Sequence, residues 1–146
     1  MTTNAYIKFI DDLEAQLMYI DVSYGIKSLA EPWLDKQINK LGAIAFSGIV
    51  HLYYECIENK PDLIINLLML VSRSKKIPLV IKRILAIDAI NQIYWAEIQD
   101  AGIRIFENME NKNDIKYLDI NNISSKDSYL NEYLIGVKKD LQEYKK

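Results

Sequence analysis

Apolar side chains recur every three or four positions along almost the whole chain, which is the period of an α-helix and not of a β-strand. With only five glycines and three prolines, the 146 residues contain few helix breakers. The length fits one domain with a core of useful size. We therefore predict an all-α fold, a compact bundle of about six helices in a single helical domain over residues 1–146. The first stripe consists of Tyr6, Ile10, Leu13, Leu17, Ile20 and Tyr24.

Glycine, proline and capping residues divide the chain into the predicted helices. The first helix ends near Gly25, and the second runs to Gly42, with its start set either by Ser28 and Glu31 at capping-box spacing or by Pro32 in the first turn. Further helices are predicted over 43–58, over 61–71 and over 79–110 with a break near Gly102. Residues 111–125 predict an ordered loop or a short irregular element, with apolar anchors at Ile115, Tyr117, Leu118, Ile120 and Ile123.

The last helix follows Ser124 and Asp127, which have the spacing of a helix cap. Its predicted stripe consists of Leu130, Leu134, Val137, Leu141 and Tyr144. The pairs of helices at about 28–58 and 61–98 have comparable lengths, so a solenoid-like stack of helix pairs is a minor alternative to the bundle.

Three helices make specific predictions about burial. The helix over 43–58 should turn Phe46, Ile49, Val50, Tyr53, Cys56 and Ile57 inward. The segment from Leu63 to Val71 is apolar all round except for Asn66 and should lie at the centre of the core. The long helix after Pro78 should bury Val80, Ile84, Ile87, Tyr94, Trp95 and Ile98. Asn66 and Asn91 would then be buried amides that need hydrogen-bond partners and fix helix register.

The sequence offers little for catalysis. His51 is the only histidine and Cys56 the only cysteine, which excludes an internal disulfide and cysteine-rich zinc sites. His51 and Glu55 are four residues apart and would share a helix face, but a metal needs at least one more ligand, so a locally bonded histidine is the favoured interpretation. No glycine-rich phosphate loop or nucleophile motif is present. We predict neither a cofactor nor a metal, and a protein that is not an enzyme.

Eighteen basic against twenty acidic side chains give a net charge of −2, so there is no global field for nucleic acid. Neither a signal peptide nor a membrane span is predicted, which suggests a cytoplasmic protein. The charges are unevenly distributed, however. One segment without any acidic residue carries the basic side chains Arg73, Lys75, Lys76, Lys82 and Arg83. A nucleic-acid-associated regulator that uses this segment is one alternative function, although no aromatic residue is interleaved with the bases.

Ten tyrosines are the more suggestive feature, because tyrosine is enriched in binding interfaces. Together with acidic segments, they predict a protein-binding module, in its concrete form a bacterial immunity- or antitoxin-type inhibitor that covers the basic surface of a toxin. A ligand- or metal-binding bundle around His51 is a further alternative, and a homo-oligomer through the last helix is compatible with each function. The predicted interface residues are Glu97, Asp100, Glu107, Glu110, Asp114, Tyr117, Tyr129 and Tyr133.

Overall fold

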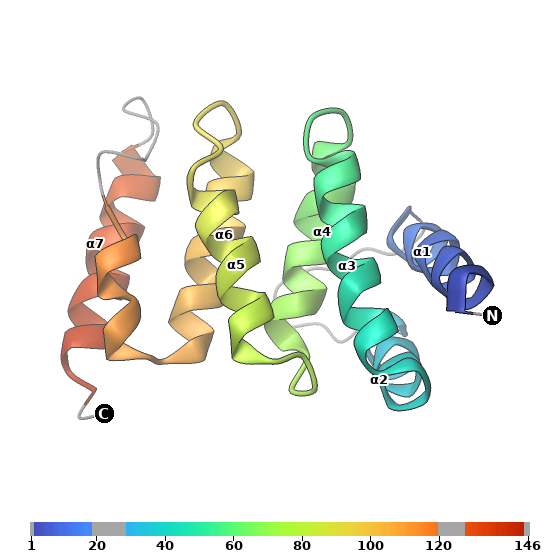
Figure 1. Cartoon of the computed structure of the whole chain (residues 1–146). Helices are drawn as coiled ribbons and strands as arrows, with labels where there is room; N and C mark the ends of the chain where they lie inside the picture. The colour runs from blue at the N-terminus through green and yellow to red at the C-terminus, as the bar shows by residue number, and fades with distance from the viewer. Residues whose placement is uncertain (1, 19–28, 120–127, 145–146) are drawn as a thin grey trace. The chain divides into compact units, whose positions relative to one another are not determined.

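The computed structural model describes residues 2–18, 29–119 and 128–144, and these residues form helices and no strand. The all-α prediction is confirmed. Within these ranges the structure has seven α-helices and one 3-10 helix, more than the predicted six or so. In chain order they are α1 Thr2–Met18, α2 Ala30–Leu41, α3 Ala43–Cys56, α4 Pro61–Arg73, α5 Leu79–Ile90, α6 Ala96–Met109, η1 Lys112–Tyr117 and α7 Ser128–Gln142 (Figure 1).

The chain divides into two compact units, Met1–Ile81 and Lys82–Lys146, with the boundary inside α5. Each unit has buried aliphatic side chains of its own. The single domain over residues 1–146 stays a prediction. Several residues singled out in the sequence lie outside the described ranges, namely Ile20, Tyr24, Gly25, Ser28, Ile120, Ile123, Ser124 and Asp127.

In the first unit, the apolar stripe of α1 packs mainly on α3, with contacts to α2 and α4. Its buried residues are Phe9, Ile10, Leu13 and Leu17, which confirms the predicted stripe at Ile10, Leu13 and Leu17. Tyr6, also predicted for the stripe, is half-buried, and Phe9 was not predicted. The ring of Phe9 stacks on Trp33 of α2, with 6.0 Å between the ring centroids. Gly48 of α3 makes room for that ring, because a Cβ there would lie 2.5 Å from Phe9 Cδ2.

Proline and glycine mark helix ends at the predicted places in this unit. Pro32 lies in the first turn of α2 and Pro61 begins α4, positions where the missing N–H costs no helical hydrogen bond. Gly42 separates α2 from α3 with a φ of 56°, a conformation that side chains with a Cβ rarely adopt. The residue before the first turn of α2 is Leu29, and its side chain makes no capping hydrogen bond.

The prediction that the fourth helix is buried over most of its surface is confirmed. The buried residues of α4 are Leu63, Ile64, Leu67, Leu68, Met69, Leu70, Val71 and Ser72. Asn66 interrupts this apolar surface and finds the partner that a half-buried amide needs, since its Nδ2 donates to the Leu17 carbonyl at 3.0 Å. On α3, Ile49, Tyr53 and Cys56 are buried as predicted, as is Ile57 just after the helix, whereas Phe46 and Val50 are only half-buried.

The predicted long helix over 79–110 is broken at residues 91–95, and the prediction of a break near Gly102 is wrong. Gly102 lies inside α6, where it allows a close approach to α5. A Cβ at this position would lie 2.9 Å from Ala89 Cβ and 3.1 Å from the Ala86 carbonyl oxygen. This glycine therefore serves helix packing, while a hydrogen-bonded turn after Ile90 ends α5.

The predicted buried face of this segment is also largely wrong. Ile98 is buried and Ile87 half-buried, but four of the residues expected inside are exposed, namely Val80, Ile84, Tyr94 and Trp95. The break explains Tyr94 and Trp95, because residues beyond Ile90 no longer continue the helical stripe. Val80 and Ile84 precede the break, and they are exposed because α5 buries its other face. Asn91 lies exposed in the turn, so it is not the buried register-fixing amide that was predicted.

The second unit contains most of α5 together with α6, η1 and α7. In it, α6 and α7 run in the same direction, with η1 between them in the chain (Figure 1). Of the short irregular element predicted over 111–125, residues 111–119 are described, and they contain the 3-10 helix η1. Arg83 of α5 holds η1 through two hydrogen bonds to the buried carboxylate of Asp114, of 2.6 and 3.2 Å. The stripe of α7 is confirmed at Leu130, Leu134, Val137 and Leu141, while Tyr144 beyond its end is partly exposed.

Candidate functional site

A hollow of about 400 Å³ lies between the C-terminal parts of α6 and α7, in the second unit. Val137 and Leu141 lie at its floor and are almost fully buried, so its exposed surface comes mainly from the other lining residues. The remaining lining residues are polar or acidic, and none is a lysine or an arginine. We call this feature the acidic hollow; it is lined by Glu107, Asn108, Glu110, Val137, Asp140, Leu141, Glu143 and Tyr144.

Helix geometry explains why the carboxylates gather at this place. Because α6 and α7 run the same way, both C-terminal ends reach the same side of the unit. The stripe that buries Val137 and Leu141 leaves Asp140 and Glu143 exposed beside it. The last turn of α6 carries no basic residue that would offset the negative end of its helix dipole. The hollow therefore combines four carboxylates with a helix C-terminus, all favouring a cation.

Two backbone and side-chain details shape the rim. Glu110 ends α6 in the left-handed conformation, with a φ of 54°, and its N–H donates to the Phe106 carbonyl. This turn brings the Glu110 side chain to the hollow, beside Tyr144. Partial burial raises the pKa of the Tyr144 phenol, and the Glu110 carboxylate raises it further. Tyr144 therefore stays a neutral hydrogen-bond donor at the edge of an anionic surface.

A row of interacting side chains, which we call the aromatic ladder, continues from the hollow along α6 and α7. It consists of Asp100, Arg104, Tyr133 and Tyr129. Tyr133 donates to Glu107, and its ring carries the guanidinium of Arg104 at 5.1 Å from the centroid. Arg104 in turn donates to Asp100 at 3.1 Å. At the outer end, Tyr129 stacks on Tyr133 with 6.4 Å between centroids and is 64% exposed. These contacts fix the orientation of Glu107 before any partner arrives.

The structure brings together only part of the predicted interface. Glu107 and Glu110 line the hollow, and Asp100, Tyr129 and Tyr133 belong to the adjoining ladder. Glu97 is exposed near the start of α6. Tyr117 stacks on Phe106 and lies under Lys116, so its ring is engaged within the unit.

The prediction that Asp114 belongs to the interface surface is wrong. It was expected on an exposed acidic surface, but its side chain is 2% exposed and paired with Arg83. Arg83 of α5 reaches this one acid of the segment and holds it inward through two hydrogen bonds.

The residues that sequence reasoning missed are Asp140 and Glu143, both on α7. Their signal was present as two acids flanking the apolar stripe of the last helix. What was missing is the neighbour of that helix, because periodicity gives the buried face of a helix but not the helix against which it packs.

The basic segment is divided between the two units, and most of its members are engaged within their own unit. In the first, Arg73 pairs with Glu31 at 3.6 Å, Lys76 donates to Asn39 and Lys75 is exposed. In the second, Arg83 is bound to Asp114, which raises the pKa of its guanidinium. Lys82 is buried, and that burial lowers the pKa of its ammonium group.

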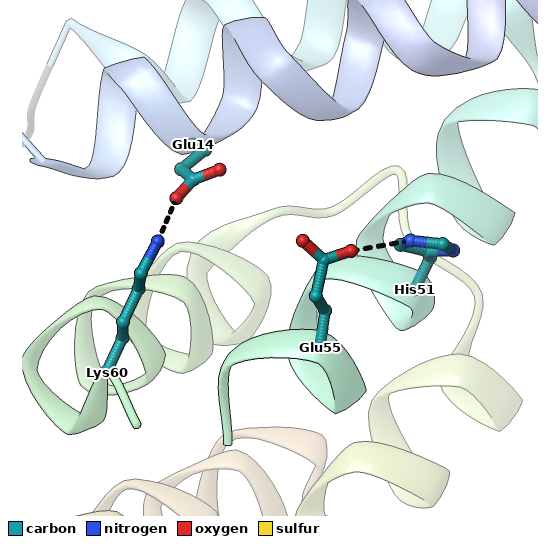
Figure 2. A network of polar contacts seen from close by, with 4 residues as sticks. All are labelled: Glu14, His51, Glu55 and Lys60. Atoms are coloured by element: carbon teal, nitrogen blue, oxygen red, sulfur yellow. Dashed lines mark hydrogen bonds and ion pairs between the residues drawn. The ribbon is translucent and has the colours of Figure 1, made fainter. Parts of the chain in front are cut away.

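His51 lies on the surface of α3, with its Nε2 2.8 Å from Glu55 Oε2 (Figure 2). The ring of Tyr6 on α1 meets it edge-on at 5.6 Å. The local bond agrees with the favoured interpretation, although the pair is exposed and not part of the core. Near it, Lys60 before α4 donates to Glu14 of α1 at 2.6 Å, which raises the pKa of Lys60 (Figure 2). These contacts tie α1 to α3 and α4.

Other chemistry finds little support in the part of the chain that the structure describes. No three histidine, cysteine, aspartate or glutamate side chains in these ranges are grouped as metal ligands would be. Cys56 is buried, and this burial raises the pKa of its thiol, the reverse of what an activated nucleophile needs. None of the described helices combines the length and the apolar character of a membrane span.

Comparisons with protein-family models, with curated proteins and with solved structures find no match to this chain.

Proposed function

We propose that this chain is a protein-binding module that takes a basic segment of a partner protein into the acidic hollow. The single observation that carries the proposal is the composition of that hollow, in which four carboxylates surround apolar surface with no lysine or arginine in the lining. Lysine and arginine side chains match both parts, because each has an apolar stem and a cationic head.

The geometry supports insertion of such a side chain. Its methylene stem would pack on the exposed part of the Tyr144 ring, while its head would reach Glu110, Asp140 and Glu143. Glu107 is held in place by Tyr133 beforehand, so less side-chain entropy is lost when a partner binds. The surrounding negative charge would also speed the encounter with a basic protein.

The narrower form of this proposal is an immunity- or antitoxin-type inhibitor of bacterial origin that acts in the cytoplasm and blocks a basic toxin domain one-to-one. It is a non-enzymatic role that needs no cofactor. A nucleic-acid-associated regulator is the alternative with less support, because Arg73, Lys76 and Arg83 are each engaged by a neighbouring side chain. A ligand site at His51 has only the exposed contact with Glu55 behind it, and the solenoid-like stack stays a proposal about the fold.

The test is a quantitative capture experiment with three immobilised proteins. The first is the natural chain, and the second is the triple variant Glu110→Gln, Asp140→Asn, Glu143→Gln, which keeps side-chain size and removes charge. The third is Glu132→Gln, an exposed acid on α7 outside the hollow, as the matched control. A basic protein retained by the first and third but lost from the second supports the proposal. Identical capture by all three proteins would show that the hollow is not the binding surface.

A further inference from the structure

The aromatic ladder shows how this unit binds an arginine side chain of its own. The guanidinium of Arg104 lies over the ring of Tyr133, 5.1 Å from the ring centroid, and its Nε donates to the Asp100 carboxylate at 3.1 Å. The hydroxyl of the same tyrosine donates to Glu107, the next acid along α6. A tyrosine ring of α7 and a carboxylate of α6 therefore hold one guanidinium between the two helices.

The acidic hollow contains the same parts further along the two helices. Tyr144 follows Tyr133 by eleven residues, which is three helical turns, so both lie on the same flank of the buried stripe of α7. The N–H of Tyr144 donates to the Leu141 carbonyl, so the chain continues to turn beyond the end of the helix. The carboxylate of Glu110 at the end of α6 lies close enough to raise the pKa of the Tyr144 phenol. Among the described residues that line the hollow, none is a lysine or an arginine, so this second arrangement lacks its cation.

We propose that the acidic hollow binds an arginine side chain of the partner in preference to a lysine, and that Tyr144 determines this preference, an inference that rests on the proposed function. The guanidinium would lie on the Tyr144 ring as that of Arg104 lies on the Tyr133 ring. It would donate to Glu110 and Asp140, as Arg104 donates to Asp100.

The chemistry of the hollow favours a guanidinium over an ammonium group. A guanidinium is planar and more weakly hydrated, so it stacks on an aromatic ring more readily than the ammonium group of lysine does. The Tyr144 side chain is 38% exposed and therefore has surface left for such a contact. The N–H groups of a guanidinium also point in fixed directions and can bridge two carboxylates. The hollow offers carboxylates from both sides, Glu107 and Glu110 from α6 and Asp140 and Glu143 from α7.

Isothermal calorimetry with hexaarginine and hexalysine, two peptides of equal length and charge, tests this inference. The quantity compared is the ratio of the two dissociation constants for each protein. We expect the natural chain to bind hexaarginine about ten-fold more tightly, because only the guanidinium stacks on the ring. Tyr144→Leu removes the ring and should reduce the ratio to about two-fold, whereas Tyr144→Phe keeps the ring and should retain the preference. Tyr94→Leu is the matched control, since Tyr94 is 88% exposed and lies outside the hollow, and it should leave the ratio unchanged.

The results that would overturn the inference differ from those that would overturn the proposed function. Saturable binding of both peptides with equal affinity would reject the preference for arginine and leave the proposed function in place. A preference that Tyr144→Leu retains, or that Tyr94→Leu loses as well, would show that it does not arise at Tyr144. A preference lost in Tyr144→Phe would assign it to the hydroxyl and reject stacking on the ring. If neither peptide binds saturably, the proposed function fails and the inference fails with it. Circular dichroism of each variant confirms that its fold is intact.

Discussion

The hydroxyl of Tyr133 on α7 donates a 2.7 Å hydrogen bond to Glu107 on α6, and this bond joins the aromatic ladder to the acidic hollow. Tyr133→Phe removes the hydroxyl and keeps the ring over which Arg104 lies. Because the bond has a charged acceptor and a half-buried donor, we expect the free energy of unfolding to fall by about 1.5 kcal/mol. Urea denaturation measures this loss. In the Tyr133→Phe background, Glu107→Gln should lower the free energy of unfolding by less than it does in the natural chain.

Alkaline pH should reduce the stability that the same contact contributes. Burial, and then the bond to Glu107, raise the pKa of the Tyr133 phenol, so the folded chain holds this proton more tightly than the unfolded chain does. The stabilisation is complete below the ordinary phenol pKa of about 10 and is lost as pH rises from there towards the raised pKa. Urea unfolding at about pH 8 and 11 should show a larger loss in the natural chain than in Tyr133→Phe. Equal losses in the two proteins would contradict this assignment.

Replacing Arg83 alone should lower the free energy of unfolding much more than replacing Arg83 and Asp114 together. Arg83→Met leaves a carboxylate whose side chain is 2% exposed without its partner, so we expect a loss of about 3 kcal/mol in unfolding free energy. The double variant Arg83→Met, Asp114→Leu should recover most of it, since an apolar pair needs no counter-charge. A loss below about 0.5 kcal/mol in the single variant, as for a surface substitution, would mean that the pair does not hold η1.

Two glycines of the second unit should respond to alanine with opposite signs. At Gly102 an added Cβ would lie 2.9 Å from Ala89 Cβ and 3.1 Å from a backbone oxygen of α5, and we expect Gly102→Ala to cost about 2 kcal/mol. Gly136 lies exposed in α7 with nothing within 4 Å of its missing Cβ. Gly136→Ala should therefore stabilise the protein by about 0.5–1 kcal/mol through helix propensity. Thermal denaturation of both variants checks the pair, and destabilisation by both would refute the packing role of Gly102.

Sequence periodicity predicted those parts of the fold in which burial follows from one helix alone. The stripes of Ile10, Leu13 and Leu17 on α1 and of Leu134 and Val137 on α7 are examples. It failed at the end of α5 and the start of α6. Gly102 has the character of a breaker, yet the actual end of α5 is a turn stabilised by main-chain hydrogen bonds, for which Asn91 and Gln92 gave only a weak signal.

For a related reason, the sequence predicted only two of the four carboxylates of the candidate site. Glu107 and Glu110 were singled out as acids of a charged segment, but Asp140 and Glu143 join them only because α7 runs parallel to α6. Nothing within a single helix encodes that neighbour. Asp114 belongs to the same acidic segment in the sequence and is nevertheless buried, because Arg83 lies against η1 in three dimensions.

Titration of a hexalysine peptide tests the central claim most directly, since the peptide carries the proposed chemistry and no other. Isothermal calorimetry at low and moderate salt should show saturable binding to the natural chain and to Glu132→Gln, weakened by salt. The triple variant Glu110→Gln, Asp140→Asn, Glu143→Gln should bind at least ten-fold more weakly. Equal affinity of all three proteins for the peptide, or no saturable binding even at low salt, would contradict the assignment of the acidic hollow as a site for basic segments.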